Sequence, residues 1–259
     1  MYFVAKPNTD AFNFLDAAGI TRTDNNSAII KGIADLTTDL RQYGLWDKMK
    51  AIYPMVGGTS GSHKFNLKDP RDTENAFRLA FSGSWTHSST GARPAGTVGT
   101  YADTYLNSST QLTNRNVHIS YYARANSTSA EVSLIGTTGF GGQTTGHIQY
   151  NVYSSNRIYP TLGGNRIDIT VGNLLVFHTV TSLDGSTNGM RAYTNGVLRG
   201  TATNNSSGLP NATLILANGY VPSPFECAFA SIGDGLTDTE AANFYTAVQR
   251  FQTTLGRQV

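Results

Sequence analysis

The alternation of hydrophobic and polar residues predicts β-strands through most of the chain after residue 73. Leu174–Thr181 is rich in Val, Leu, Phe and Thr, which favour the half-buried surface of a sheet. Asn195-Gly196 lies between Met190–Tyr193 and Val197–Thr203, and this residue pair suits a type I′ turn because both of its central positions need positive φ. We therefore expect three antiparallel strands joined by turns between residues 174 and 203.

The remaining strand-like segments are short, regularly spaced and separated by turns, with no helical pattern between them. This arrangement is typical of an antiparallel β-sandwich. Residues 83–99, rich in Gly, Ser and Thr, are expected to form a long loop. The predicted strands are Ala76–Trp85, Thr100–Leu106, Val117–Ala125, Val132–Ile135, Ile148–Tyr153, Arg157–Leu162, Arg166–Val171, Thr213–Leu216 and Cys227–Ile232.

Helical patterns occupy both ends of the chain. Thr9 can cap a short helix that reaches Ala18, and Asp24 or Asn25 can cap a second one that ends at Gly44. The second of these helices has an apolar stripe whose residues recur at spacings of three and four. The stripe consists of Ile29, Ile33, Leu36, Leu40 and Tyr43.

The last predicted helix follows a capping box formed by Thr237 and Glu240. Its apolar face consists of Ala241, Phe244, Tyr245, Val248, Phe251 and Leu255. Because an exposed stripe of this size favours aggregation, we expect the two stripes to pack together or on one flank of the sandwich. The sequence therefore predicts a helical lead-in over residues 1–72, packed on a β-sandwich over residues 73–259 that includes the closing helix.

Composition and charge narrow the possible functions. Of the 36 charged residues, 18 lie at or before Glu74, and the net charge of +2 is too small to favour nucleic acid or an anionic membrane as partner. Cys227 is the only cysteine, which excludes an intrachain disulfide. The first residues lack the pattern of a signal peptide, and no apolar stretch is long enough to span a membrane. We expect a protein made in the cytoplasm, with no membrane partner.

Two parts of the sequence resemble known families. Phe229–Glu240, together with the Asn-Gly hairpin, is similar to the final strand and "GLs-x-x-E" helix entry of concanavalin A-like lectin/glucanase sandwiches, particularly laminin-G-like ones. Asn75–Asn107, with its lead-in Lys48–Asp72, resembles domains of tailed-phage virion proteins. These resemblances imply a mainly β fold, an antiparallel concanavalin A-like jelly roll, in a tail, fibre or head-decoration protein. They also imply several copies on the virion, in contact with other virion proteins.

Three functions follow from the resemblance: a non-enzymatic lectin-like module that binds host-surface glycans, a carbohydrate-active enzyme, and a structural protein without ligand. A retaining glycosidase needs two carboxyl groups roughly 5–5.5 Å apart. The Glu-x-Asp-x-x-Glu motif of the glucanases is absent, and His147-Ile148-Gln149 is only the reverse of the Gln-Ile-His tripeptide of related alginate lyases. We therefore expect no catalytic residues. Nothing in the sequence separates the first function from the third, and we take the first, as a virion module, as the prediction.

No metal or cofactor is expected. The five histidines form no HxxxH or HxH pair, and Gly57–Ser62 lacks the spacing of a phosphate-binding loop. Asp184–Asn188 lacks the alternating acidic residues of a calcium loop and is better explained as a turn. Calcium held by residues from elsewhere in the chain stays open.

Aromatic residues next to turns are the candidates for ligand binding. An exposed ring can pack on the apolar face of a sugar while neighbouring amides bind its hydroxyl groups. The alternative is that each ring fills the core or an end of the sandwich. We favour this alternative for any single ring, Trp85 included, and less strongly for Tyr153 and Tyr220. The candidates are Trp85, Tyr101, Tyr153, Tyr159 and Tyr220.

Overall fold

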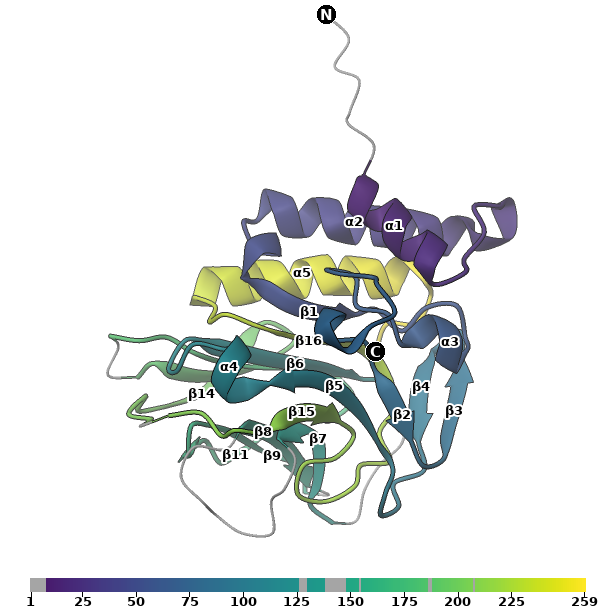
Figure 1. Cartoon of the computed structure of the whole chain (residues 1–259). Coiled ribbons are helices and arrows are strands. Elements are labelled where there is room, and N and C mark those ends of the chain that lie inside the picture. The colour runs from purple at the N-terminus through teal and green to yellow at the C-terminus, as the bar shows by residue number, and fades with distance from the viewer. Residues whose placement is uncertain (1–7, 126–129, 138–147, 154, 186–187, 207) are drawn as a thin grey trace, which may run out of the picture.

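The computed structural model describes residues 8–125, 130–137, 148–153, 155–185, 188–206 and 208–259. Two antiparallel sheets pack face to face, and the long helices lie on the outer side of one of them (Figure 1). This arrangement confirms the predicted mainly β sandwich with a helical lead-in and a C-terminal helix.

The first sheet has the strand order β14-β13-β12-β6-β16-β4-β3, and β1 also pairs with β16. The predicted Asn195-Gly196 turn is confirmed, with φ values of 49° and 70°. The strands of this sheet are β1 (Met49–Tyr53), β3 (Trp85–Ser88), β4 (Gly91–Pro94), β6 (Val117–Ala123), β12 (Phe177–Ser182), β13 (Met190–Thr194), β14 (Val197–Ala202) and β16 (Cys227–Gly233).

The second sheet has the order β10-β9-β8-β7-β15-β5-β2, with β11 also paired to β9. Its inner face packs on the first sheet and forms one hydrophobic core with it. The strands are β2 (Ala80–Ser82), β5 (Tyr101–Asn107), β7 (Val132–Thr137), β8 (Ile148–Tyr153), β9 (Arg157–Leu162), β10 (Asn165–Arg166), β11 (Ile169–Thr170) and β15 (Thr213–Leu216).

The helices form a second hydrophobic core on the outer face of the first sheet. An aromatic row across three strands, Phe177, Tyr122 and Phe229, contributes to it. The helices are α1 (Thr9–Ala17), α2 (Ser27–Gln42), α3 (Ser60–His63), α4 (Ser108–Gln111) and α5 (Asp238–Thr254), with 3-10 turns η1 (Asp24–Asn26), η2 (Trp46–Lys48) and η3 (Glu74–Ala76). None of the helices that the structure describes is long and apolar enough to cross a membrane.

The two predicted stripes meet, since α2 packs along α5. Tyr43 is the exception, because it lies at the end of α2 and is exposed. The helices approach closely at Gly32, where an added Cβ would lie 3.1 Å from the Phe251 ring. The capping box of α5 is present as predicted, with the Glu240 amide donating to the Thr237 hydroxyl and the Thr237 amide donating to the Glu240 carboxylate. The central strands of the first sheet are thus buried on both faces, whereas its edge strand β14 is largely exposed and the second sheet is packed on its inner face.

The predicted strand Ala76–Trp85 and the predicted loop over residues 83–99 are both wrong in part. Phe77 has a φ of 58°, so the extended run is interrupted and only β2 forms. The predicted loop contains the hairpin β3–β4, which belongs to the other sheet. Residues 83–99 are mostly Ser, Thr and Gly, so they show no alternation of hydrophobic and polar side chains that would reveal the strands β3 and β4. At α1, Asn8 caps the helix rather than Thr9.

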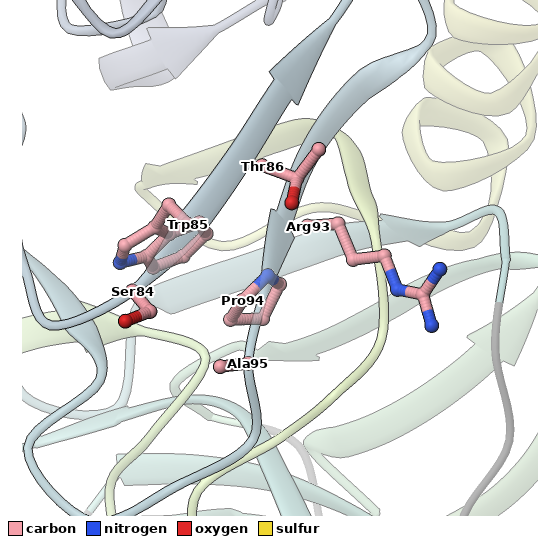
Figure 2. Close-up of a pocket in the computed structure, with 6 residues that line it drawn as sticks. All are labelled: Ser84, Trp85, Thr86, Arg93, Pro94 and Ala95. Atoms are coloured by element: carbon pink, nitrogen blue, oxygen red, sulfur yellow. The ribbon is translucent and has the colours of Figure 1, made fainter.

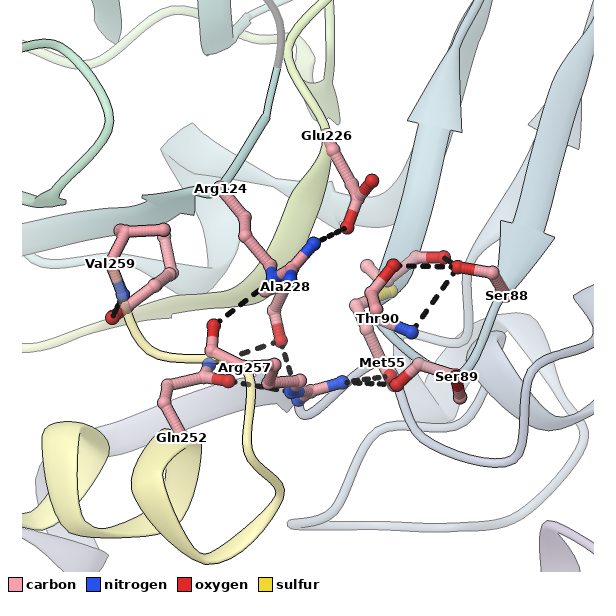
Figure 3. Close-up of polar contacts among 12 residues, drawn as sticks. Met55, Ser88, Ser89, Thr90, Arg124, Glu226, Ala228, Gln252, Arg257 and Val259 are labelled. Atoms are coloured by element: carbon pink, nitrogen blue, oxygen red, sulfur yellow. Dashed lines mark hydrogen bonds and ion pairs between the residues drawn. The ribbon is translucent and has the colours of Figure 1, made fainter.

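The buried guanidinium of Arg257 joins the C-terminal tail to the lead-in and to the first sheet (Figure 3). It donates to the carbonyl oxygens of Pro54 at 2.6 Å, Met55 at 2.7 Å and Ala228 at 2.8 Å, and to Gln252 Oε1 at 2.6 Å. Four well-formed partners compensate the desolvation of a buried charge. This junction fixes three distant parts of the chain to one another.

Candidate functional site

The outer face of the second sheet has no helix over it among the described residues (Figure 1). Side chains alternate between the two faces of a strand. In β8, Ile148, Tyr150 and Val152 point into the core, so the residues between them point outward. In β9, Ile158 and Leu162 point inward in the same way. The outward positions are Gln149, Asn151 and Tyr153 in β8, and Arg157, Tyr159 and Thr161 in β9.

Two of the predicted tyrosines present their rings to solvent at this face. Tyr153 is 37% exposed at the end of β8, and Tyr220 is 53% exposed in the segment after β15. The Tyr220 amide donates to the hydroxyl of Ser133, which stands directly opposite the outward-pointing Asn151. Tyr220 is thereby held over β7, next to the strand that carries Tyr153.

A close backbone approach places the Tyr220 segment on the sheet. Gly219 has a φ of 151°, and a Cβ added to it would lie 3.0 Å from the Cα of Gly136 in β7. A Cβ added to Gly136 would likewise lie 3.2 Å from the Cα of Gly219. Both positions need glycine, because any side chain would push the segment away from the sheet.

Buried polar atoms without a hydrogen-bond partner lie on the same face. Three such side-chain atoms occur among the described residues, and two of them are Asn151 Oδ1 in β8 and Thr161 Oγ1 in β9. The Asn151 amide group is engaged, since its Nδ2 donates to Glu131 Oε1 at 2.7 Å. A buried acceptor without a partner is costly, and a bound water or ion is one way to satisfy it. We call Asn151, Tyr153, Tyr159, Thr161 and Tyr220 the tyrosine face.

Tyr159 has a different environment from Tyr153 and Tyr220. It is only 8% exposed, and its ring lies between two guanidinium groups, with Arg166 at 4.2 Å and Arg157 at 5.3 Å from the ring centroid. Arg157 also pairs with Asp168 at 2.5 Å. The Tyr159 ring therefore packs against the two guanidinium groups and is not accessible for stacking on a ligand.

The other two predicted residues lie elsewhere. Tyr101 is half-buried on β5, separated from β7 by β15. Trp85 packs against the core, with its ring edge-on to Phe81 at 5.1 Å and its Nε1 donating to the Ser82 carbonyl at 2.9 Å. The structure thus brings Tyr153, Tyr159 and Tyr220 together, and it keeps Tyr101 and Trp85 apart from them.

A pocket of about 220 Å³ lies at the hairpin β3–β4 (Figure 2). In this hairpin Trp85 is paired with Pro94, and Thr86 is paired with Arg93. Figure 2 shows Trp85 and Arg93 extending in different directions, with Pro94 between them. The lining residues are Ser84, Trp85, Thr86, Arg93, Pro94 and Ala95.

The structure joins two histidines that lie far apart in the sequence. His63 Nδ1 and His87 Nδ1 are 3.0 Å apart, and the Gly58 amide donates to His63 Nε2. Because His63 Nε2 accepts a hydrogen bond, its proton is on Nδ1 and is donated to His87. No three His, Cys, Asp or Glu side chains converge on a metal position within the described residues, and His147 lies outside these residues. Cys227 is buried, and this burial raises the pKa of its thiol to about 12.

Comparison with known proteins finds similarity of fold. No family model matches the chain, and no curated protein matches it. The binding domain of botulinum neurotoxin DC, solved with rat synaptotagmin II, is 13% identical with a TM-score of 0.57, over 79% of this chain and 52% of that chain. Botulinum neurotoxin type C, whose cell entry depends on two ganglioside molecules, is 13% identical with a TM-score of 0.55, over 80% and 53%.

A Trypanosoma rangeli sialidase mutant with trans-sialidase activity is 10% identical with a TM-score of 0.56, over 86% of this chain and 39% of that chain. The chain therefore spans about half or less of the length of these structures. Identities this low establish the fold alone. The protein shares a lectin-like β-sandwich fold with these neighbours.

Proposed function

We propose that this protein is a non-enzymatic, lectin-like module that binds glycans through the tyrosine face. The observation that carries the proposal is the juxtaposition of exposed Tyr153 and Tyr220 with the unpartnered acceptors of Asn151 and Thr161. Aromatic rings bind the apolar face of a sugar ring, and polar acceptors bind its hydroxyl groups. The ganglioside dependence of the neurotoxin type C neighbour, which has the same fold, supports a glycan as ligand.

We further propose that the protein is displayed in several copies on a phage virion, where it contacts other virion proteins and faces the host surface. The support for this part is the sequence resemblance of residues 48–107 to tailed-phage virion proteins. Shallow sites that use neutral contacts are weak one at a time, and joining them on one particle raises avidity by ~10²–10⁴. Particles that lack the protein should adsorb to host cells more slowly than complete particles.

The alternative of a carbohydrate-active enzyme has less support. The sialidase neighbour is matched over 39% of its own length. Near the tyrosine face, Glu131 accepts from Asn151, whereas Asp168 is paired with Arg157. These two carboxylates have separate partners rather than facing each other as an acid and a nucleophile would. Release of reducing ends or unsaturated sugars, lost on changing Glu131 or Asp168, would establish the enzyme instead.

Replacing the exposed tyrosines should weaken glycan binding without unfolding the protein. We expect Tyr153→Ala and Tyr220→Ala each to lower affinity roughly 3–10-fold, because an aromatic contact contributes about 0.5–1.5 kcal/mol. Surface substitutions change stability by about 0.5 kcal/mol or less, so the melting temperature of each variant should stay close to that of the wild type. Titration with a bound glycan measures the affinity.

Tyr43 provides the matched control for this experiment. It is also 37% exposed, but it follows α2 on the helical side of the molecule. Tyr43→Ala should therefore leave glycan affinity unchanged. Equal losses from Tyr43→Ala and Tyr153→Ala would argue against the tyrosine face as the binding surface.

A further inference from the structure

The pocket at the hairpin β3–β4 lies in a segment of the chain that contains basic residues but no acidic ones. Residues 75–102 contain Arg78 and Arg93 but no Asp or Glu. Arg78 is paired with Asp72 at 3.5 Å and lies over the Tyr105 ring. The charge of Arg93 therefore has no acidic residue near it in the sequence.

Arg93 also differs from every other arginine in its contacts. All 13 arginines lie within the described residues. The other twelve each have a hydrogen bond, an ion pair or an aromatic ring as partner. Among the contacts of the described residues, Arg93 has none of these and projects from the hairpin (Figure 2). Its guanidinium can present its donors to a ligand without first breaking an internal contact.

The surroundings of Arg93 indicate the chemistry of that ligand. Thr86 stands directly opposite Arg93, and Ser84 follows on the same face, since the Ala95 amide donates to the Ser84 carbonyl. Both side chains are exposed, and among the described contacts their hydroxyl groups are uncommitted. Trp85 and Pro94, which pair with each other on the opposite face of the hairpin, also line the pocket. The pocket thus has a planar cation and two hydroxyl groups on one face of the hairpin, in a volume suited to one ring.

We infer that this pocket is a second binding site, distinct from the tyrosine face, for a sugar residue that carries a carboxylate. Guanidinium binds carboxylate through two parallel hydrogen bonds, which fixes orientation as well as charge. The hydroxyl groups of Ser84 and Thr86, on the same face as Arg93, bind the sugar hydroxyls. The inference goes beyond the proposed function, because it assigns a different surface and a charged class of sugar.

The test is titration of the full-length protein with glucuronate, followed by nuclear magnetic resonance. Glucose, which has the same ring without the carboxylate, should bind at least tenfold more weakly, and so should acetate, which has no ring. Arg93→Gln should weaken glucuronate binding at least tenfold. Arg93→Lys should lower the affinity for glucuronate several-fold, because an ammonium group keeps the charge but lacks the two parallel N–H donors of a guanidinium. Binding should also weaken as salt is added.

Arg71→Gln is the matched control, because Arg71 is exposed, lies outside the hairpin and pairs with Asp69. It should leave glucuronate binding unchanged. The inference fails if Arg93→Gln binds glucuronate like the wild type, or if glucose, acetate or inorganic phosphate binds as tightly as glucuronate. A Tyr153→Ala/Tyr220→Ala double variant should keep glucuronate binding, so this result is independent of the proposed function.

Discussion

The free energy of unfolding should fall steeply as the pH is lowered from 6.5 to about 4. Three buried histidines cause this, because burial lowers the pKa of His63 to about 3 and the pKa values of His118 and His178 to about 4. Each is held neutral by partners on both ring nitrogens. A proton added to the second nitrogen would face a donor and bury a charge.

The hydrogen bonds identify the neutral tautomers. His118 Nδ1 donates to the Asp234 carbonyl at 2.6 Å, and its Nε2 accepts from the Ser231 hydroxyl at 3.1 Å. His178 Nε2 donates to the Leu174 carbonyl at 2.8 Å, and its Nδ1 accepts from the Tyr150 hydroxyl at 3.2 Å. These networks are complete only when the imidazole carries a single proton.

The direction in which stability changes with pH follows from the number of protons that the folded and unfolded chains bind. Below pH 6.5 the unfolded chain gains a proton at each of these three histidines, while in the folded chain these three gain none until about pH 4. Stability is therefore fully present above 6.5 and is lost by up to about 1.4 kcal/mol per pH unit for each histidine. At pH 4 the total loss is of the order of 10 kcal/mol, comparable with the whole stability of an ordinary domain.

Denaturant unfolding at a series of pH values measures this loss. The hydrogen bond from Arg71 holds the pKa of Asp69 below its ordinary value, so this carboxylate titrates beneath the histidine window. His178→Gln should lower stability at pH 7.5 but make the pH dependence shallower by about one proton. An unfolding free energy that stays constant between pH 7 and 4.5 would be incompatible with three buried neutral histidines.

Removal of residues 1–69 should leave no stably folded protein. The deletion takes β1 away from β16 and α2 away from α5, which exposes the apolar face that includes Phe251. Exposed apolar surface of this extent promotes aggregation. We propose on these contacts that the lead-in and the sandwich form one folding unit. A soluble remainder with an unchanged melting temperature would contradict this.

A point variant tests the same unit without a deletion. Arg257→Met removes the guanidinium that joins Pro54 and Met55 to Ala228, and leaves their carbonyl oxygens buried without a donor. We expect a loss of about 3–5 kcal/mol. Arg22→Met is a suitable control, since Arg22 pairs with Asp16 and both side chains are exposed, so the change should cost about 1 kcal/mol or less.

Much of the fold could be read from local patterns. β8, β9 and β15 have their predicted bounds, and the capping box and the Asn195-Gly196 turn depend on residue types at fixed spacings. The pairing of β1 with β16 could not be predicted, because it joins residues about 180 positions apart and depends on tertiary packing. The hairpin β3–β4 was hidden for a different reason, since its Ser and Thr residues show no periodicity.

The candidate site was predictable only in its residue types. Turn-flanking positions gave Tyr153 and Tyr220 a weaker case for burial than the other candidate rings, and both are exposed. The sequence carried no sign that Asn151 and Thr161 would lie beside them, because that depends on the register of β7, β8 and β9. Arg93 was missed as well, since an arginine without a partner is recognised only when the partners of the other arginines are known.

The most direct test of glycan binding is a glycan array probed with the protein as a monomer and as an engineered multimer. We predict that the multimer binds a defined set of glycans, that the monomer binds the same set ~10²–10⁴-fold more weakly, and that a Tyr153→Ala/Tyr220→Ala multimer loses this set. A Tyr43→Ala multimer should match the wild type. A wild-type multimer that binds no glycan, or a double variant that binds as well as the wild type, would contradict the assignment of the tyrosine face as a glycan-binding surface.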